Sequence, residues 1–152
     1  MFRIMFVCHG NICRSPMAEF VLKAMVAKAG VADKFYIASS ATSTEEIGNP
    51  VHPGTREKLA KYGISVAGKR AVQLTKADYA KYDVILAMDE ANLRNIKSIV
   101  GSDSKHKVKL LLSYSTRPRA IADPWYTGNF DVTYKDIVEG CTGLLQQLCL
   151  QL

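Results

Sequence analysis

The sequence predicts an α/β fold: a single-domain, three-layer sandwich in which a four-stranded parallel sheet, in the strand order 2-1-3-4, is flanked by helices. Two observations lead to this prediction. Short apolar runs alternate along the chain with longer amphipathic segments, which is typical of a parallel sheet. The first apolar run ends in a loop with glycine and asparagine, where this strand order has its topological switch point. We therefore expect one domain over residues 1–152 that binds its ligand at the carboxyl ends of the strands.

The first half of the chain alternates strand-like and helix-like segments. Its apolar runs are short and β-compatible, whereas its longer segments repeat apolar residues at helical spacing. Ser15 and Pro16 suit the N-cap and the first position of the first helix, and Gly63 suits the end of the second. We expect strands over 2–7 and 34–39 and helices over 16–28 and 52–62.

The second half continues this alternation and ends in a long helix. Residues 69–82 are expected to be irregular with one short helix, and 113–126 form a long connection, which in a compact domain is often functional. The last helix is expected from Phe130 onward and to be loosened near Gly140 and Gly143, because glycine weakens a helix interior. We also expect strands over 83–88 and 108–112 and a helix over 89–100.

Composition and charge limit the possible partners. An apolar content of 48% with 22% charged residues fits an ordinary globular domain. The net charge of +6 indicates attraction to anions. The lysines are spread widely and no nucleic-acid motif is recognised, so nucleic acid is not expected as a partner. No apolar run approaches the roughly 20 residues of a membrane span, so membrane insertion is not expected.

The four cysteines, at positions 8, 13, 141 and 149, are too few for a disulfide scaffold in a chain of this length. No signal peptide precedes them, so a cytoplasmic location is expected. Cys141 and Cys149 share the last helix about 12 Å apart along its axis, which excludes a shared tetrahedral zinc. Both are expected to face the core, and we expect no metal and no cofactor.

The chemistry is concentrated in residues 8–16, Cys-His-Gly-Asn-Ile-Cys-Arg-Ser-Pro. Gly10 and Asn11 readily adopt left-handed backbone angles, which lets successive N–H groups turn inward around an anion, as in a P-loop. The following helix N-terminus favours the same anion, and it also favours the thiolate of Cys8. Arg14 presents a planar fork of donors that matches two phosphate oxygens. We predict that Cys8 is a nucleophile toward a phosphoryl group. The alternative is a buried cysteine at the end of a strand.

A proton donor for the leaving oxygen is expected at Asp123. Pro124 holds Asp123 in an extended conformation, so its carboxyl group can project from a loop. Trp125 and Tyr126 follow and can wall a slot for an aromatic ring. An ordinary Asp-Pro turn with surface aromatics is the alternative, and the need of the first motif for an acid favours the catalytic interpretation.

These two segments resemble the low-molecular-weight protein tyrosine phosphatases. The resemblance continues, in the same order, through Ser39–Ser43, Glu46–Pro50 and Met88–Leu93, and it covers nearly the whole chain. The first motif alone would also match arsenate reductases. The resemblance implies a protein phosphatase, a hydrolase, that acts on phosphotyrosine in proteins or peptides and on small aryl phosphates. It further implies that inorganic phosphate and other oxyanions bind as product or inhibitor.

The resemblance also implies a role for each catalytic residue. Cys8 would form a phosphocysteine intermediate, and Arg14 would bind the phosphate and the transition state. Asp123 would be the general acid of the first step and the general base of the second. Cys13 would close a reversible disulfide with Cys8 under oxidation. The residues expected to contact substrate or phosphate are His9, Gly10, Asn11, Ile12, Cys13, Ser15, Trp125 and Tyr126.

Other residues would support this loop. The resemblance implies that Asn11 holds it in its strained shape with help from Ser39, and that Ser15 assists the ionisation and departure of Cys8. Asp89 follows an expected strand, where it can order the surroundings of Arg14 as well as cap its own helix.

Two departures from the family's pattern concern loop support and specificity. The family often has a histidine in the segment 66–73 that supports the loop asparagine. Here that histidine is absent and the segment looks one residue longer, which leaves the support of Asn11 open. Trp125 stands where many members carry tyrosine, and Glu45 stands where some carry an aromatic rim residue. Both changes bear on substrate preference rather than on chemistry.

Alternatives to phosphotyrosine hydrolysis rank lower. Relatives that act on phosphoarginine tend to carry threonine where this chain has Ile12. Arsenate reduction needs further cysteines to relay a disulfide, and Cys141 and Cys149 are not expected to reach the loop. A non-enzymatic phosphate- or nucleic-acid-binding module would leave the coincidence of nucleophile, arginine and acid unexplained.

Overall fold

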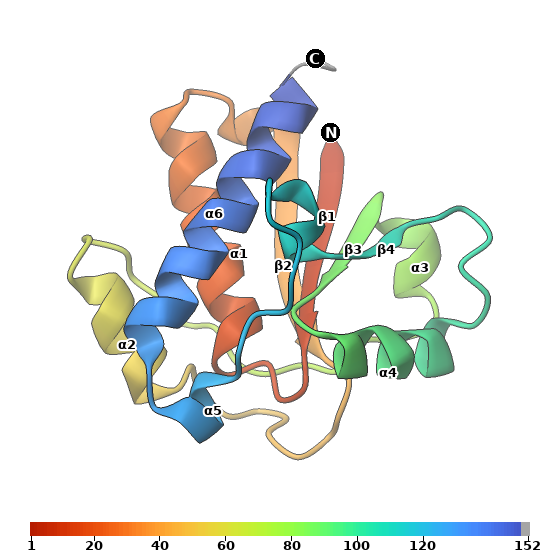
Figure 1. Cartoon of the computed structure of the whole chain (residues 1–152), viewed down its shortest axis with the longest axis horizontal. Helices are drawn as coiled ribbons and strands as arrows, with labels where there is room; N and C mark the ends of the chain where they lie inside the picture. Colours follow the sequence, from red (N-terminus) through yellow and green to blue (C-terminus); the bar gives the residue numbers. More distant parts are fainter. Residues whose placement is uncertain (150–152) are drawn as a thin grey trace.

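The computed structural model describes residues 1–149 and contains, within them, one four-stranded sheet (Figure 1). Its order is β2-β1-β3-β4, and all neighbouring strands are parallel, which confirms the predicted architecture and strand order. The strands are β1 (Phe2–Cys8), β2 (Phe35–Ala41), β3 (Val84–Ala87) and β4 (Val108–Leu110). The helices are α1 (Arg14–Lys28), α2 (Pro53–Ala60), α3 (Asp78–Lys81), α4 (Glu90–Val100), α5 (Pro124–Thr127) and α6 (Phe130–Cys149), with short 3₁₀ turns η1 (Ala32–Lys34) and η2 (Leu111–Tyr114).

The helices cover both faces of the sheet. Figure 1 shows α1, α2 and α6 on one side and α3 and α4 on the other. In β1, Ile4 and Phe6 pack into the larger core cluster with α1 and α6, whereas Met5 and Val7 pack into the smaller one with α4. Because both faces of β1 are covered, its sequence is apolar throughout rather than alternating. Within residues 1–149, no helix combines the length and apolarity needed to cross a membrane.

The predicted loosening of the last helix is wrong. Helix α6 runs without a break from Phe130 to Cys149. A Cβ atom on Gly143 would overlap the backbone carbonyl of Tyr114, and one on Gly140 would lie 2.6 Å from Cγ of Leu111. These glycines therefore let α6 lie directly against the turn η2.

The predicted start of the first helix is also wrong. Helix α1 begins at Arg14, so that Ser15 lies inside its first turn and Cys13 occupies the N-cap position. The Ser15 hydroxyl cannot cap the helix, because it is engaged by Cys8 and Asn11 instead.

Two further expectations need correction in the second half. Strand β4 ends at Leu110, because Leu111 and Leu112 leave the sheet in η2 and are buried in the core. Cys141 faces the core as predicted, but Cys149 is exposed, since the periodicity of α6 turns that position outward. The N-caps of α2 and α4 are His52 and Asp89, and the cap at Asp89 was predicted.

Candidate active site

The loop between β1 and α1, residues 9–13, lies at the carboxyl edge of the sheet, at the lower edge of Figure 1 beside α5. It follows the strand from which the chain passes to both sides of the sheet, the expected ligand position in an open α/β fold. The segment after β2 and the start of α2 pack around this loop.

The loop backbone is held from outside through its carbonyl groups. Donors on the segment after β2 and on the start of α2 lie between 2.8 and 3.0 Å from these oxygens. Asn11 has a φ of 59°, in the left-handed region. The carbonyl groups bonded in this way belong to Cys8, His9, Ile12 and Cys13.

The side chain of Asn11 is buried and fully engaged in holding this shape. Its Nδ2 donates to Oγ of Ser15 at 2.8 Å and to Oγ of Ser39 at 2.9 Å. Its Oδ1 accepts the backbone N–H of Val72 at 3.1 Å. The support of Asn11 therefore comes from these three partners, without the family's histidine.

An ion pair between half-buried Lys69 and buried Glu19 lies behind Ser39. The Ser39 hydroxyl donates to Oε1 of Glu19 at 2.6 Å, and Nζ of Lys69 donates to the Ser39 carbonyl at 2.8 Å. The ammonium lies 3.6 Å from the Glu19 carboxylate. Burial lowers the pKa of Lys69, and the nearby Glu19 opposes that shift. Sequence reasoning missed both roles, although Lys69 falls in the segment that lacks the histidine.

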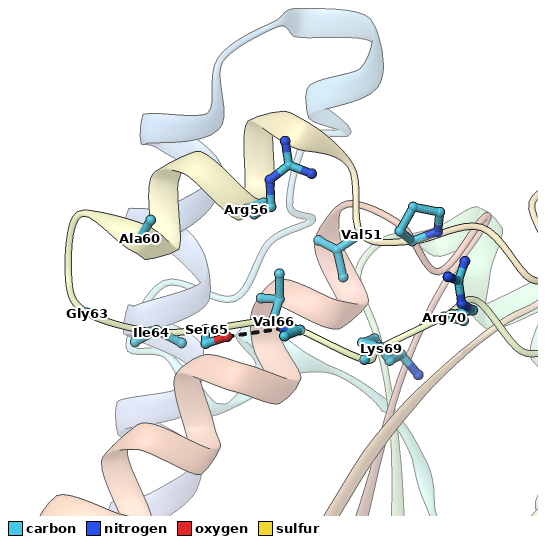
Figure 2. Close-up of a pocket in the computed structure, with 12 residues that line it drawn as sticks. Val51, Arg56, Ala60, Gly63, Ile64, Ser65, Val66, Lys69 and Arg70 are labelled. Atoms are coloured by element: carbon cyan, nitrogen blue, oxygen red, sulfur yellow. Dashed lines mark hydrogen bonds between the residues drawn. The ribbon is translucent and has the colours of Figure 1, made fainter.

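A larger cavity of about 520 Å³ lies between α2 and the segment 63–70, and Cys8 is not part of its wall. Figure 2 shows Lys69 at one end of this cavity, with its side chain directed away from α2. The candidate catalytic residues Cys8, Arg14 and Asp123 instead line the smaller cavity described below.

The two cysteines of the loop differ in their surroundings. Sγ of Cys8 is buried and lies 3.0 Å from the Ser15 hydroxyl and 3.4 Å from the Ser15 backbone N–H, which donates to it. Burial, together with the nearby negative charges of Cys8 and Asp123, raises the pKa of Cys13 to about 12. Cys13 thus stays a neutral thiol, whereas Cys8 has donors directed at its sulfur. All four cysteines are free.

The guanidinium of Arg14 is buried and held in place by three oxygens. Its Nη1 donates to Oδ2 of Asp89 at 2.7 Å and to the carbonyl of Ile121 at 2.9 Å. Its Nη2 lies 3.3 Å from Oδ2 of Asp123. The other oxygen of Asp123 accepts the N–H of Trp125 at 3.0 Å, which places Asp123 at the N-cap of α5.

These side chains meet in a cavity of about 110 Å³. Asn11, Ser15, Ser39 and Asp89 stand behind its wall, where they hold the lining residues. Across the described part of the chain, no three His, Cys, Asp or Glu side chains come together as a metal site. The lining residues are Cys8, His9, Gly10, Ile12, Cys13, Arg14, Glu45, Glu46, Asp123, Trp125 and Tyr126.

Comparison with known proteins identifies the family. The family model described as low molecular weight phosphotyrosine protein phosphatase matches residues 3–151. The chain belongs to this family. It is 39% identical over 150 residues to the low molecular weight protein-tyrosine-phosphatase YfkJ of Bacillus subtilis, covering 97% of this chain and 96% of that protein. It is 41% identical over 149 residues to the low molecular weight phosphotyrosine protein phosphatase of Mus musculus, covering 95% of this chain and 94% of that one.

Solved structures of two phosphatases share the fold. The crystal structure of YfkJ superposes with a TM-score of 0.93, covering 99% of this chain and 96% of that chain. The structure of DARP, the drosophila arginine phosphatase, is 30% identical with a TM-score of 0.87, covering 95% and 96%. As a member of this phosphatase family, the chain is a hydrolase.

The remaining cysteines of this phosphatase lie away from the loop. Cys141 is buried under α1, with Sγ 3.9 Å from the carbonyl oxygen of Ala18, and burial raises its pKa. Cys149 is exposed two turns further along α6. Neither lines the cavity with Cys8, which disfavours a disulfide relay of the kind that arsenate reduction needs.

Proposed function

We propose that the protein hydrolyses phosphotyrosine and small aryl phosphates through a phosphocysteine intermediate on Cys8. One observation carries the proposal: a buried sulfur, the guanidinium of Arg14 and the carboxyl group of Asp123 face one small cavity. Since the loop carbonyls are bonded from outside, its N–H groups are left to surround the phosphate oxygens.

The first step transfers the phosphoryl group to sulfur. The Cys8 thiolate attacks phosphorus, the S–P bond forms and the P–O bond to the phenol breaks, while Asp123 gives its proton to the leaving oxygen. Arg14 binds two phosphate oxygens and stabilises the charge of the transition state. Arg14 and Asp123 lie 3.3 Å apart, so the same arginine positions both phosphate and acid.

The second step frees the enzyme. Water attacks the phosphocysteine, its proton passes to Asp123, the S–P bond breaks and inorganic phosphate leaves. The hydroxyl and N–H of Ser15 stabilise the departing thiolate, because both lie within 3.4 Å of Sγ. The cycle consumes one water and requires no metal.

The shape of the cavity favours an aryl phosphate. Its nucleophile is buried, whereas Trp125 and Tyr126 stand exposed at the mouth, so a long flat side chain can reach the sulfur between aromatic walls. Phosphoserine is too short to use both ends of such a site.

The first test is hydrolysis of para-nitrophenyl phosphate in EDTA under reducing conditions. We expect turnover by the wild type and none by Cys8→Ser, which should still bind phosphate. Asp123→Ala should slow the first step by roughly 10²–10⁴-fold, most for poor leaving groups. The pH profile should be bell-shaped on the acidic side, because Asp123 must start protonated and Cys8 ionised.

The outcomes separate the candidate functions. Turnover in Cys8→Ser, or equal loss for alkyl and aryl phosphates in Asp123→Ala, contradicts the assigned roles. A phosphoarginine peptide serves as the second substrate, because DARP, named as an arginine phosphatase, shares the fold. Faster turnover of that peptide than of its phosphotyrosine counterpart would replace the proposed substrate.

A further inference from the structure

The mouth of the cavity is acidic, although the whole chain carries a net charge of +6. The lining contributes the carboxylates of Glu45, Glu46 and Asp123 against the guanidinium of Arg14 and the imidazole of His9. Arg14 is paired with Asp89 at 2.7 Å and lies 3.3 Å from Asp123, so the two glutamates set the charge of the rim. Carboxylates repel a phosphate dianion, so their position calls for a positive group elsewhere on the substrate.

Contacts with the phosphate-binding loop hold both glutamates at the mouth. Oε2 of Glu45 lies 2.9 Å from Nε2 of His9. Oε2 of Glu46 accepts from Nδ2 of Asn49 at 2.5 Å, and the Glu46 side chain packs beside Gly10. The same segment is tied to the loop by the hydroxyl of Ser43, which donates to the His9 carbonyl at 2.8 Å. Both carboxylates thus stand beside the loop at the mouth of the cavity.

The other wall of the mouth also suits a cation. Trp125 and Tyr126 on α5 are 56% and 83% exposed, an unusual exposure for large aromatic rings. His52 packs edge-on against Trp125, with ring centroids 5.6 Å apart, and so orients the indole. The faces of exposed tryptophan and tyrosine attract ammonium and guanidinium groups.

We propose that this rim selects phosphotyrosine segments that carry arginine or lysine next to the phosphotyrosine, an inference that rests on the function proposed above. The cationic side chain pairs with Glu45 and Glu46 and packs on the exposed rings while the phosphate occupies the loop. An acidic neighbour meets like charge at the same place and binds more weakly.

The test uses three phosphotyrosine peptides that differ only in the residues flanking the phosphotyrosine: arginine, alanine or glutamate. For the wild type at low salt we expect kcat/KM to be roughly three- to tenfold higher for the arginine peptide than for the glutamate peptide, since exposed pairs contribute modestly. The difference should lie in KM and should shrink with added salt, because the rim is exposed.

Variants assign the preference to the rim. Combining Glu45→Gln with Glu46→Gln should remove the preference, and Glu45→Lys with Glu46→Lys should reverse it. Glu57→Gln is the matched control: it makes the same charge change on an exposed acid of α2 outside the cavity lining, and it should keep the wild-type ratio.

The outcomes for the rim and for the proposed function are distinguishable. The wild type can hydrolyse para-nitrophenyl phosphate and still show equal kcat/KM for the three peptides at low salt. That result overturns the rim inference and leaves the phosphatase function standing. A preference that persists in the Glu45→Gln, Glu46→Gln protein also overturns it. Failure of the wild type on para-nitrophenyl phosphate and on all three peptides overturns both.

Discussion

A half-buried lysine stands behind the loop that follows Cys8. Lys69 is bonded to the Ser39 carbonyl at 2.8 Å and lies 3.6 Å from Glu19, whose carboxylate also accepts the Ser39 hydroxyl. Ser39 in turn accepts from Asn11, the residue that holds the loop in its left-handed turn. Burying an ammonium group costs solvation, which is why the pKa of Lys69 is lowered. Its position therefore favours a role in holding the loop and balancing the charge near Cys8.

Replacing Lys69 by methionine should change the pH dependence of catalysis. Without the cation, the Glu19 carboxylate is less well balanced and disfavours the thiolate. We expect the acid limb of kcat/KM to move up by roughly half to one pH unit, which lowers kcat/KM on that limb by roughly three- to tenfold. The measurement is a pH profile on para-nitrophenyl phosphate, with melting temperatures recorded beside it.

Two controls separate this role from simple damage to the fold. Lys69→Arg keeps the positive charge and should lie closer to wild type than Lys69→Met. Lys61→Met removes an exposed lysine at the end of α2 and should leave the profile unchanged. A folded Lys69→Met protein with the wild-type acid limb would show that the lysine has no electrostatic role.

The sequence allowed prediction of the side chains that line the site far better than of those behind it. Cys8 and Arg14 flank one short loop, and Asp123 stands in an Asp-Pro pair, so local spacing and chemistry were sufficient. Glu19 and Lys69 meet at β2 from segments 50 residues apart along the chain (69 − 19 = 50). An ion pair of this kind leaves no periodic pattern in the sequence, so only the tertiary structure reveals it.

At the scale of elements, the contact of α6 with η2 depends on glycine. A methyl group on Gly143 would overlap the Tyr114 carbonyl, a backbone atom that cannot turn aside. Gly143→Ala should therefore destabilise the protein by roughly 1–3 kcal/mol, although alanine is the better helix former by about 1 kcal/mol. Urea unfolding measures the change.

The matched control for this prediction lies on the same helix. Gln146→Ala changes an exposed position of α6 and should alter the unfolding free energy little, because both residues favour helix. A Gly143→Ala protein as stable as wild type would mean that α6 can move away from η2 without loss.

Periodicity predicted which elements exist, but tertiary contacts decided where they end. The apolar spacing placed α1 and β4 correctly along the chain. It missed the start of α1 because the Ser15 hydroxyl serves Cys8 and Asn11, and the end of β4 because Leu111 and Leu112 turn into the core. Gly143 was misjudged for the same reason, since helix propensity takes no account of what lies against a face.

At the scale of the whole molecule, carboxylates with lowered pKa values tie separate elements together. The hydrogen bond from Lys58 lowers the pKa of Asp131, which links α2 to α6. Hydrogen bonds from Arg119, and then from Ser115, lower the pKa of Glu139 from its ordinary 4.5 to about 2. The ion pair of Arg119 and Glu139 fixes the segment before Asp123 onto α6. The position of the proposed acid therefore depends on an ion pair outside the cavity.

The sign of these shifts predicts the response of the fold to acid. A carboxylate whose folded pKa lies below its unfolded value contributes stability above pH 4.5, and for Glu139 that contribution is lost as the pH falls toward about 2. Glu139→Gln should therefore melt about 2–4 °C below wild type at pH 7, a modest gap because the pair is partly exposed. The gap should narrow strongly near pH 2.5, where the wild type has lost most of the same contribution. Glu57→Gln, on an exposed acid of α2, should melt with the wild type at both pH values. If the Glu139→Gln gap were the same at pH 2.5 as at pH 7, packing rather than charge would hold the segment before Asp123 in place.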